Sequence, residues 1–312
     1  VVETNIHAPS DSHLLEDSVR VIGRTLQRAK QVISKQTGLA DKVFRNRIRS
    51  ARKTGRQIRR LITRQKEAGK QAYRKLVKIT KETVDQAKQV LETLAEISDD
   101  PAQGLRDTLE TFIPRAEQVI EQTIRRVFQD EKVPAEDKIV SIFEPHTAII
   151  RRGKAGKPVE YGRKVWLDEV EGGIVTRWEV LDGNPSDKLQ WVPSLDAHQQ
   201  LFGKPPTQAS ADRGVFSADN ETEAKSRGIK RVVLPKPGKK SEKRRQHEKQ
   251  PWFRRARKWH AGVEGRISVL KRCYNLDRCL NHGQDGFHRW VGWGVITHNL
   301  NKIGSTVVAR SG

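Results

Sequence analysis

The chain has 312 residues and is strongly basic, with 60 Lys and Arg against 38 Asp and Glu, a net charge of +22 and a pI near 10.2. This excess favours a polyanionic partner, because Lys and Arg neutralise phosphates and release their counterions. A membrane protein is not indicated, since the sequence has no signal peptide and no run of roughly 18–20 apolar residues that could span a bilayer.

A short strand and four long helices are expected in the N-terminal half. Val1 to Ile6 has the composition of a strand. Apolar residues then recur at helical spacing in four segments, which cover about 11–38, 42–64, 66–97 and 101–127. These segments predict an all-α insertion of about 115 residues, packed through interleaved apolar stripes.

The second of these helices carries the densest basic face of the chain. Its cations are Arg45, Arg47, Arg49, Arg52, Lys53, Arg56, Arg59 and Arg60. Such a face is either solvated or in contact with phosphates, and the net charge favours contact with DNA phosphates. Nothing in the pattern indicates base-specific readout.

After a polar, Pro-containing linker at 131–137, the period changes from helical to strand-like. Ile139 to Phe143 is expected as a short strand, and 151–158 as a basic, Gly-rich loop without the Walker pattern. The segments 163–168 and 174–181 flank Glu171-Gly172-Gly173 and predict a hairpin, followed by a helix over 188–202. The acids Asp168, Asp182 and Asp187 are interpreted as hairpin-edge and cap residues.

Asp212 follows a short predicted strand of small residues. Open α/β folds place their chemistry at the carboxyl ends of strands, so Asp212 is a candidate metal ligand. The alternative is that Asp212 caps the next helix. A helix over 217–227 and a strand over 231–234 would complete a right-handed crossover unit, and 236–250 is expected as a mobile loop that meets phosphate.

Glu264 lies among many cations on a predicted amphipathic helix over 259–272. A lone carboxylate there either forms a surface ion pair or binds a divalent metal beside a phosphate-binding cation. Lys271 is seven residues further on, about two turns, and so shares its face. Trp252, Phe253 and Trp259 bracket Arg254, Arg255, Arg257 and Lys258, an arrangement that suits either stacking on bases or packing on the sheet. A last helix is expected over 287–303, with His298 as a core histidine.

Asp212-Arg213-Gly214, the segment 228–235 and the Glu264 helix together resemble the catalytic core of bacterial insertion-sequence transposases of the DDE type, in the group not assigned to the main families. The resemblance implies a ribonuclease-H-like fold in which two Asp and one Glu bind Mg²⁺ or Mn²⁺. Asp212 would be the second Asp and Glu264 the Glu, while Lys271 would contact the transposon-end DNA. Arg213, Arg254, Arg255, His260 and Arg266 are further candidates for DNA contact. The family's upstream Tyr and Arg are replaced by Arg257 and His260.

Residues 1–12 resemble the family stretch that follows the first catalytic Asp, and the sequence contains no Met. The resemblance implies that this Asp, and a helical DNA-binding region before it, lie upstream of Val1. The chain is then an N-terminally truncated fragment that binds DNA but cleaves it poorly or not at all. Glu3 and Asp11 are nearby carboxylates, although Asp11 suits a helix cap better.

The sequence therefore predicts an α/β protein, with a ribonuclease-H-like mixed five-stranded sheet, flanking helices and a large all-α insertion. The domains would be 1–10, 11–130 and 131–312. The expected activity is metal-dependent cleavage and strand transfer at insertion-sequence ends, on double-stranded DNA, with a possible homodimer in the synaptic complex. A ribonuclease-H-like nuclease without strand transfer and a non-catalytic basic DNA-binding protein are the alternatives. Cys273 and Cys279, which lack metal-site partners, are expected as reduced thiols of a cytoplasmic, nucleoid-associated protein.

Overall fold

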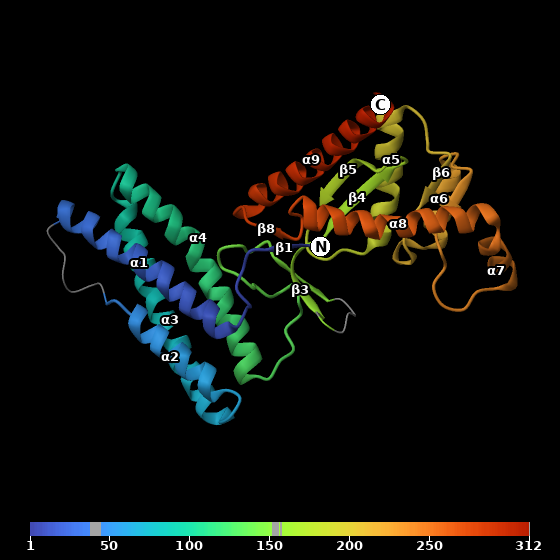
Figure 1. Cartoon of the computed structure of the whole chain (residues 1–312). Helices are drawn as coiled ribbons and strands as arrows, with labels where there is room; N and C mark the ends of the chain where they lie inside the picture. Colours follow the sequence, from blue (N-terminus) through green and yellow to red (C-terminus); the bar gives the residue numbers. More distant parts are fainter. Residues whose placement is uncertain (38–44, 152–155, 157, 312) are drawn as a thin grey trace. The chain divides into compact units, whose positions relative to one another are not determined.

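The computed structural model describes residues 1–37, 45–151, 156 and 158–311. The chain forms two compact units (Figure 1). The helical unit comprises Ile6–Thr147, and the sheet unit comprises Val1–Asn5 together with Ala148–Gly312. None of the helices in the described ranges is long and apolar enough to cross a membrane.

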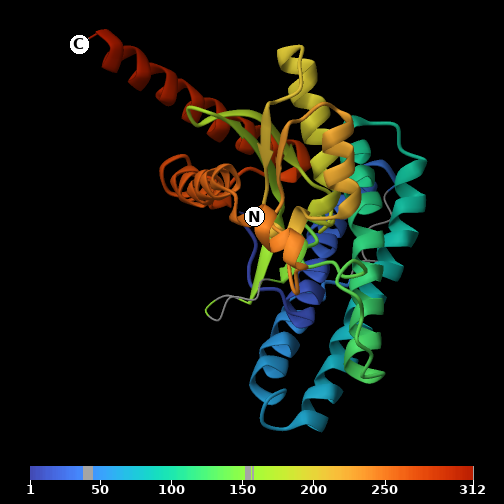
Figure 2. The same ribbon diagram turned by 90° about the vertical axis from the view of Figure 1, so that its right-hand side faces the viewer.

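The helical unit contains the four predicted helices, which lie side by side in Figures 1 and 2. They are α1 (Asp11–Thr37), α2 (Ile48–Leu61), α3 (Lys66–Ala95) and α4 (Asp100–Thr123), and α4 continues into a π-helical turn, η1 (Ile124–Phe128). Their apolar stripes form one core around Leu15, Ile22, Leu76 and Leu109, all completely buried. The predicted onset of the second helix at 42–44 lies outside the described residues.

Close backbone approach fixes α2 on α1. A Cβ at Gly55 of α2 would collide with the Glu16 side chain of α1, and a Cβ at Gly23 of α1 would lie 3.0 Å from Ile48 of α2. Glycine at both positions therefore allows these helices to pack tightly, despite its unfavourable helix propensity.

The strand predicted over Ile139–Phe143 is wrong, because this segment has no strand pairing. Ile139 and Ile142 are buried in the helical core instead. The backbone groups find side-chain partners on α4: the Gln122 side chain bonds both the N–H and the carbonyl of Ile139, at 3.0 and 3.2 Å, and Arg115 donates to the Ile142 carbonyl at 2.7 Å. The segment 131–147 thus packs with the helices, whereas the sequence assigned it to the catalytic core.

The described residues of the sheet unit form three separate sheets. A four-stranded sheet has the order β2-β3-β1-β8, in which β1 is antiparallel to β3 and parallel to β8. The strands β4 and β5 form an antiparallel hairpin, as predicted, and β6 and β7 form a parallel pair, as the predicted crossover requires. The bounds are β1 Val2–Thr4, β2 Ala148–Arg151, β3 Val159–Arg163, β4 Val165–Val170, β5 Ile174–Val180, β6 Gln208–Ser210, β7 Arg231–Val233 and β8 Arg278–Cys279.

The predicted five-stranded sheet is corrected by this topology. The described strands do not form one five-stranded sheet, and the first strand pairs with β3 and β8. The chain passes from the four-stranded sheet to the β4–β5 hairpin at Lys164, which lies between β3 and β4. The Lys164 ammonium bonds the Pro185 carbonyl at 2.8 Å. The β2–β3 hairpin was not predicted, and most of its predicted loop at 151–158 lies outside the described residues.

Five α-helices accompany these sheets: α5 (Trp191–Phe202), α6 (Ala218–Ser226), α7 (Glu242–Lys249), α8 (Pro251–Cys273) and α9 (Gly283–Ser311), with short 3-10 turns η2 (Asp187–Gln190) and η3 (Arg213–Val215). Figure 2 shows the C-terminal part of α9 extending beyond the β4–β5 hairpin. His298 on α9 is a buried core histidine: its Nε2 hydrogen-bonds the Gly173 carbonyl at 3.0 Å, while its Nδ1 is buried without a hydrogen-bond partner.

The segment 236–250, predicted as a mobile loop, contains α7. Glu248 anchors this helix: its carboxylate accepts from the Lys236 N–H at 3.0 Å, from Lys240 at 2.5 Å and from Arg244 at 2.8 Å. Burial raises the pKa of Glu248, but these three donors outweigh burial and lower the pKa to about 2. Charged hydrogen bonds therefore fix a segment that has almost no apolar residues.

Candidate active site

The strand β6 and the turn after it fix the position of Asp212. Ala211, directly before it, is buried and donates its N–H to the Val233 carbonyl at 3.2 Å. Val215, three residues later, is buried in the same core. Asp212 itself begins η3 without a side-chain cap hydrogen bond, and its side chain is 74% exposed. The capping alternative is therefore wrong, and the carboxylate is available to other groups.

His260 on α8 binds this carboxylate. Its Nε2 donates to Asp212 Oδ1 at 3.1 Å, while Nδ1 lies 3.5 Å from Ser210 Oγ at the end of β6. The hydrogen bond from His260 lowers the pKa of the Asp212 carboxyl, and outweighs partial burial, which raises it. Asp212 is consequently held as an anion against the face of α8 that carries His260.

Glu264 lies one turn beyond His260 on the same helix and is exposed. Residues four apart on a helix are neighbours on one face, with Cβ atoms about 5–6 Å apart. Asp212, His260 and Glu264 also line a single large groove of the sheet unit, about 2080 Å³ in volume. The two carboxylates, 52 positions apart in the sequence, thus face the same space.

The predicted phosphate-binding residues on α8 have different surroundings. Lys271 and Arg255 line the groove, and the Lys271 ammonium lies 3.5 Å from the exposed carboxylate of Asp277. Arg254 is exposed but is not part of the groove lining.

Arg266 and Arg213 are the remaining predicted DNA contacts. Arg266 forms an ion pair with the nearly buried Glu169 of β4, and its guanidinium lies 5.3 Å from the centre of the Trp259 ring. Arg213 in η3 is exposed and does not line the groove. Arg266 is therefore already engaged, whereas Arg213 is accessible from solvent.

A polar network on β4, β5 and α5, whose residues also line the groove, was not predicted from the sequence. The Trp166 indole donates to Asp168 Oδ1 at 2.7 Å and to Ser194 Oγ at 2.8 Å, and Arg177 pairs with Asp168 at 3.3 Å. The predicted hairpin contained a signal for it, since Trp166 and Asp168 alternate onto one face and Asp168 is opposite Arg177 in the register.

The N-terminal strand also reaches the groove, because Val1 and Val2 are among its lining residues. The two carboxylates considered near this strand are engaged elsewhere. Glu3 pairs with Arg278 at 3.2 Å, and Asp11 is buried in the helical unit, where Arg126 and Gln122 bond it at 2.8 and 3.0 Å.

The donor set of the groove suits a hard divalent cation. Mg²⁺ is commonly bound through one or two carboxylates, with waters and substrate phosphates completing its octahedron. Asp212 and Glu264 offer two exposed carboxylates in one groove. Within the described residues no group of three or more His, Cys, Asp and Glu is placed to hold a metal ion.

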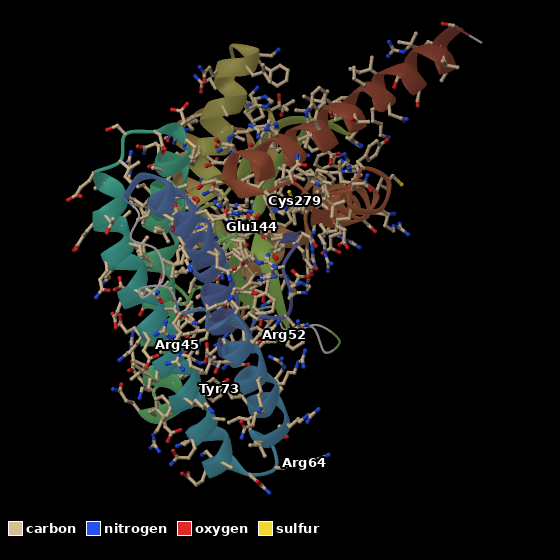
Figure 3. The ribbon with its side chains drawn as sticks, turned by 90° about the vertical axis from the view of Figure 1, so that its left-hand side faces the viewer. Arg45, Arg52, Arg64, Tyr73, Glu144 and Cys279 are labelled. Atoms are coloured by element: carbon tan, nitrogen blue, oxygen red, sulfur yellow. The ribbon has the colours of Figure 1, made fainter. Side chains whose placement is uncertain are left out.

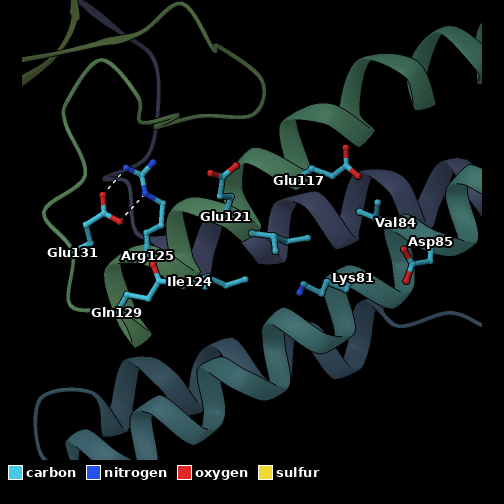
Figure 4. A pocket seen from close by; sticks show the side chains of 10 residues that line it. Lys81, Val84, Asp85, Glu117, Glu121, Ile124, Arg125, Gln129 and Glu131 are labelled. Atoms are coloured by element: carbon cyan, nitrogen blue, oxygen red, sulfur yellow. Dashed lines mark hydrogen bonds and ion pairs between the residues drawn. The ribbon is translucent and has the colours of Figure 1, made fainter.

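The helical unit has a smaller cavity, of about 580 Å³, between α3 and α4 (Figure 4). Two of its acids are paired with basic residues: Arg125 pairs with Glu131, and the Glu117 carboxylate lies 2.6 Å from the Lys88 ammonium. Its lining also includes Lys81, Asp85 and Glu121, so acids and bases are mixed around it.

Residues 220–304 match the family model described as transposase DDE domain. The matched segment contains His260, Glu264 and Lys271, and begins eight residues after Asp212. Comparisons with curated proteins and with solved structures gave no match.

Proposed function

We propose that the chain is a DDE-type transposase of insertion sequences and that it carries the metal-binding groove for DNA cleavage and strand transfer. The match of residues 220–304 to the transposase DDE domain model supports this proposal. The substrate is double-stranded DNA at the ends of the mobile element and at its target. Two copies of the chain would pair to hold two such ends.

The observation that supports this proposal most strongly is the link between Asp212 and α8. His260 bonds Asp212 and lies one turn from Glu264, and all three line one groove. A purely structural role would not require two acids from distant segments to face one solvent-filled space on a strongly basic protein. A metal-dependent phosphoryl transfer does, because it needs anionic ligands beside phosphate-binding cations.

Five side chains of the groove have a stated role in this proposal. Asp212 and Glu264 would hold Mg²⁺ or Mn²⁺, which when bound activates the attacking hydroxyl and stabilises the leaving oxygen. Lys271 and Arg255 would bind the phosphates that flank the scissile bond. His260 keeps the Asp212 carboxylate oriented towards α8.

A third carboxylate would be placed before Val1. The resemblance of residues 1–12 to the stretch after the first catalytic Asp implies this residue, and Val1 and Val2 line the groove that holds Asp212 and Glu264. An Asp added a residue or two before Val1 is expected to increase cleavage.

Nicking of a supercoiled plasmid in Mg²⁺ tests the proposal. The chain extended by this Asp should nick faster than the 312-residue chain. Asp212→Asn or Glu264→Gln should each reduce nicking by about 100-fold or more, because even residues that only support a metal ligand are typically worth about 10–100-fold. Asp219→Asn, an exposed acid on α6, is the matched control and should nick normally. Undiminished nicking by Asp212→Asn would refute the assignment.

A second assay separates the transposase from a simple nuclease. An oligonucleotide with a 3′-hydroxyl end is incubated with target plasmid and the extended chain, and joined products are counted. Hydrolysis without joining would favour a ribonuclease-H-like nuclease. Binding with neither activity would favour a non-catalytic basic protein.

A further inference from the structure

One face of α2 in the helical unit consists almost entirely of cations. The helix carries six Lys and Arg and no acidic residue. At 100° per residue, five of the six fall within an arc of roughly 100°. They are Arg49, Arg52, Lys53, Arg56 and Arg60, and all five are exposed.

The opposite side of α2 explains this exposure. Ala51, Thr54, Gly55 and Ile58 are buried, and α2 packs through them on α1 and α3. The apolar side of the helix is therefore already covered, and the basic face is directed away from the core. Figure 3 shows the side chains of this region, with Arg52 labelled on α2 and Arg64 just after it.

Two neighbouring cations outside this face are paired, whereas those on the face are not. Arg59, which flanks the face on α2, pairs with Glu16 at 2.5 Å, and Arg47, which directly precedes α2, pairs with Glu82 at 2.9 Å. Within the described residues, none of the five cations of the face forms an ion pair. Five like charges on one helical face repel one another, so binding of an anionic partner would reduce this repulsion.

The length of the face is compatible with a DNA duplex. From Arg49 to Arg60 the helix rises about 16 Å, and duplex DNA carries one phosphate charge for about every 1.7 Å of its axis. A stretch of duplex of that length therefore carries more phosphates than the face presents cations. We propose that this face of α2 binds the sugar-phosphate backbone of duplex DNA, outside the metal-binding groove and without reading base sequence.

The chemistry of the face favours DNA over an anionic membrane. A helix that lies in a membrane interface inserts an apolar face beside its basic one, but the apolar residues of α2 are packed in the helical core. The other exposed residues among the cations are polar, namely Ser50 and Gln57. That the polyanion is DNA rather than another phosphate polymer rests on the proposed function.

The test measures duplex binding by the full 312-residue chain as a function of salt. Five phosphate contacts contribute about 4.5 to the magnitude of the slope of log K against log salt, at 0.9 per contact. The variant Arg49→Gln/Arg52→Gln/Arg56→Gln should reduce that magnitude by about 2.7 and weaken binding at least tenfold near 0.1 M salt. Two duplexes of unrelated sequence should lose affinity equally.

The matched control is Lys75→Gln/Lys78→Gln/Lys81→Gln, which removes the same charge from exposed positions of α3 in the same unit. This variant should keep most of the affinity. Equal losses in both variants, or no loss in the α2 variant, would overturn the proposal. Circular dichroism and thermal melting should show that both variants fold as the parent does, because all six positions are exposed.

Two further measurements test whether the α2 face binds a membrane instead of DNA, and whether its DNA binding is independent of the groove. Vesicles rich in phosphatidylserine should bind the parent and the α2 variant alike; loss of vesicle binding with duplex binding intact would overturn the proposal in favour of a membrane. Asp212→Asn in the extended chain should lose nicking but keep the salt slope. Retained nicking there would refute the metal site alone and would leave the α2 face unaffected.

Discussion

Replacing Gly162 by alanine should displace the first strand, β1. Gly162 lies on β3 opposite Glu3 of β1. A Cβ at Gly162 would be 2.7 Å from the Glu3 Cα and closer still to the Val2 carbonyl oxygen, below the 3.0 Å that real Cβ contacts respect. Both neighbours are backbone atoms, so no side chain can move aside. The strand β1 must shift, and with it the end of the strand that lines the groove.

The expected cost of Gly162→Ala is about 2–3 kcal/mol, the upper part of the range for overpacking a well-packed site. For a unit of this size, 1 kcal/mol corresponds to about 2–4 °C, so the melting temperature should fall by about 4–12 °C. The same substitution at Gly304 on α9, where a Cβ would meet nothing within 4 Å, should not lower it.

Tryptophan fluorescence provides an assay that is specific to this unit. All seven tryptophans, at positions 166, 178, 191, 252, 259, 290 and 293, belong to the sheet unit, and the helical unit has none. Fluorescence-detected unfolding therefore reports the sheet unit without interference from the helices. If Gly162→Ala melts within about 1 °C of the parent by this signal, the close approach of β1 and β3 is not what holds the strand in place.

Two other substitutions test the charged contacts of the sheet unit. Glu248→Gln should lower the free energy of unfolding at pH 7 by at most about 3 kcal/mol, from a pKa depressed from 4.5 to about 2. The parent has this stability in full above pH 4.5 and loses it as pH falls towards 2, so fluorescence-detected urea titrations of the two proteins should converge in acid. His260→Gln should raise the pKa of Asp212 towards its ordinary value, because the hydrogen bond from His260 is the largest cause of its depression. Carboxyl ¹³C chemical shifts measured against pH would detect the rise, and an unchanged pKa would mean that His260 does not hold Asp212.

The four helices of the helical unit could be predicted because their signal is local. Residues such as Leu15, Ile22 and Leu76 recur at the helical period, and each stripe is long enough to exclude a strand. Ile139 to Phe143 shows where this reasoning fails. A short apolar run is the same in sequence whether it pairs in a sheet or packs against helices, and here the side chains of Gln122 and Arg115 on α4 take the place of a neighbouring strand.

The helix α7 was missed for a different reason. Its residues, Glu242 to Lys249, have almost no apolar members, so periodicity gives no signal. What fixes the segment is the set of ionic contacts around Glu248, and these depend on where side chains meet in space. The strand pairing was equally hidden, because β1, β6 and β7 have three residues each, too few to specify a partner.

At the groove, the sequence proposed the two acids but not the contact that holds one of them. Glu264 was a candidate because it is a lone acid among many cations, and Asp212 because it ends a predicted strand, whereas His260 was predicted only as a DNA contact. The structure brings His260 onto Asp212, a contact between residues 48 positions apart. Such a contact cannot be predicted from a local sequence pattern, because it depends on how β6 and α8 pack.

The net charge of +22 likewise says how many cations the chain has but not which of them can bind phosphate. Arg266 already contacts the nearly buried Glu169 and the Trp259 ring, so it would have to break both contacts before it could bind a phosphate. Lys271 faces only the exposed Asp277, at 3.5 Å, an ion pair worth less than about 1 kcal/mol in water. A phosphate in the groove can therefore displace Asp277 from Lys271 far more easily than it can displace Glu169 from Arg266. Although both cations follow Glu264 on one helix, Lys271 is the one that we expect to bind the DNA backbone beside the metal-binding carboxylates.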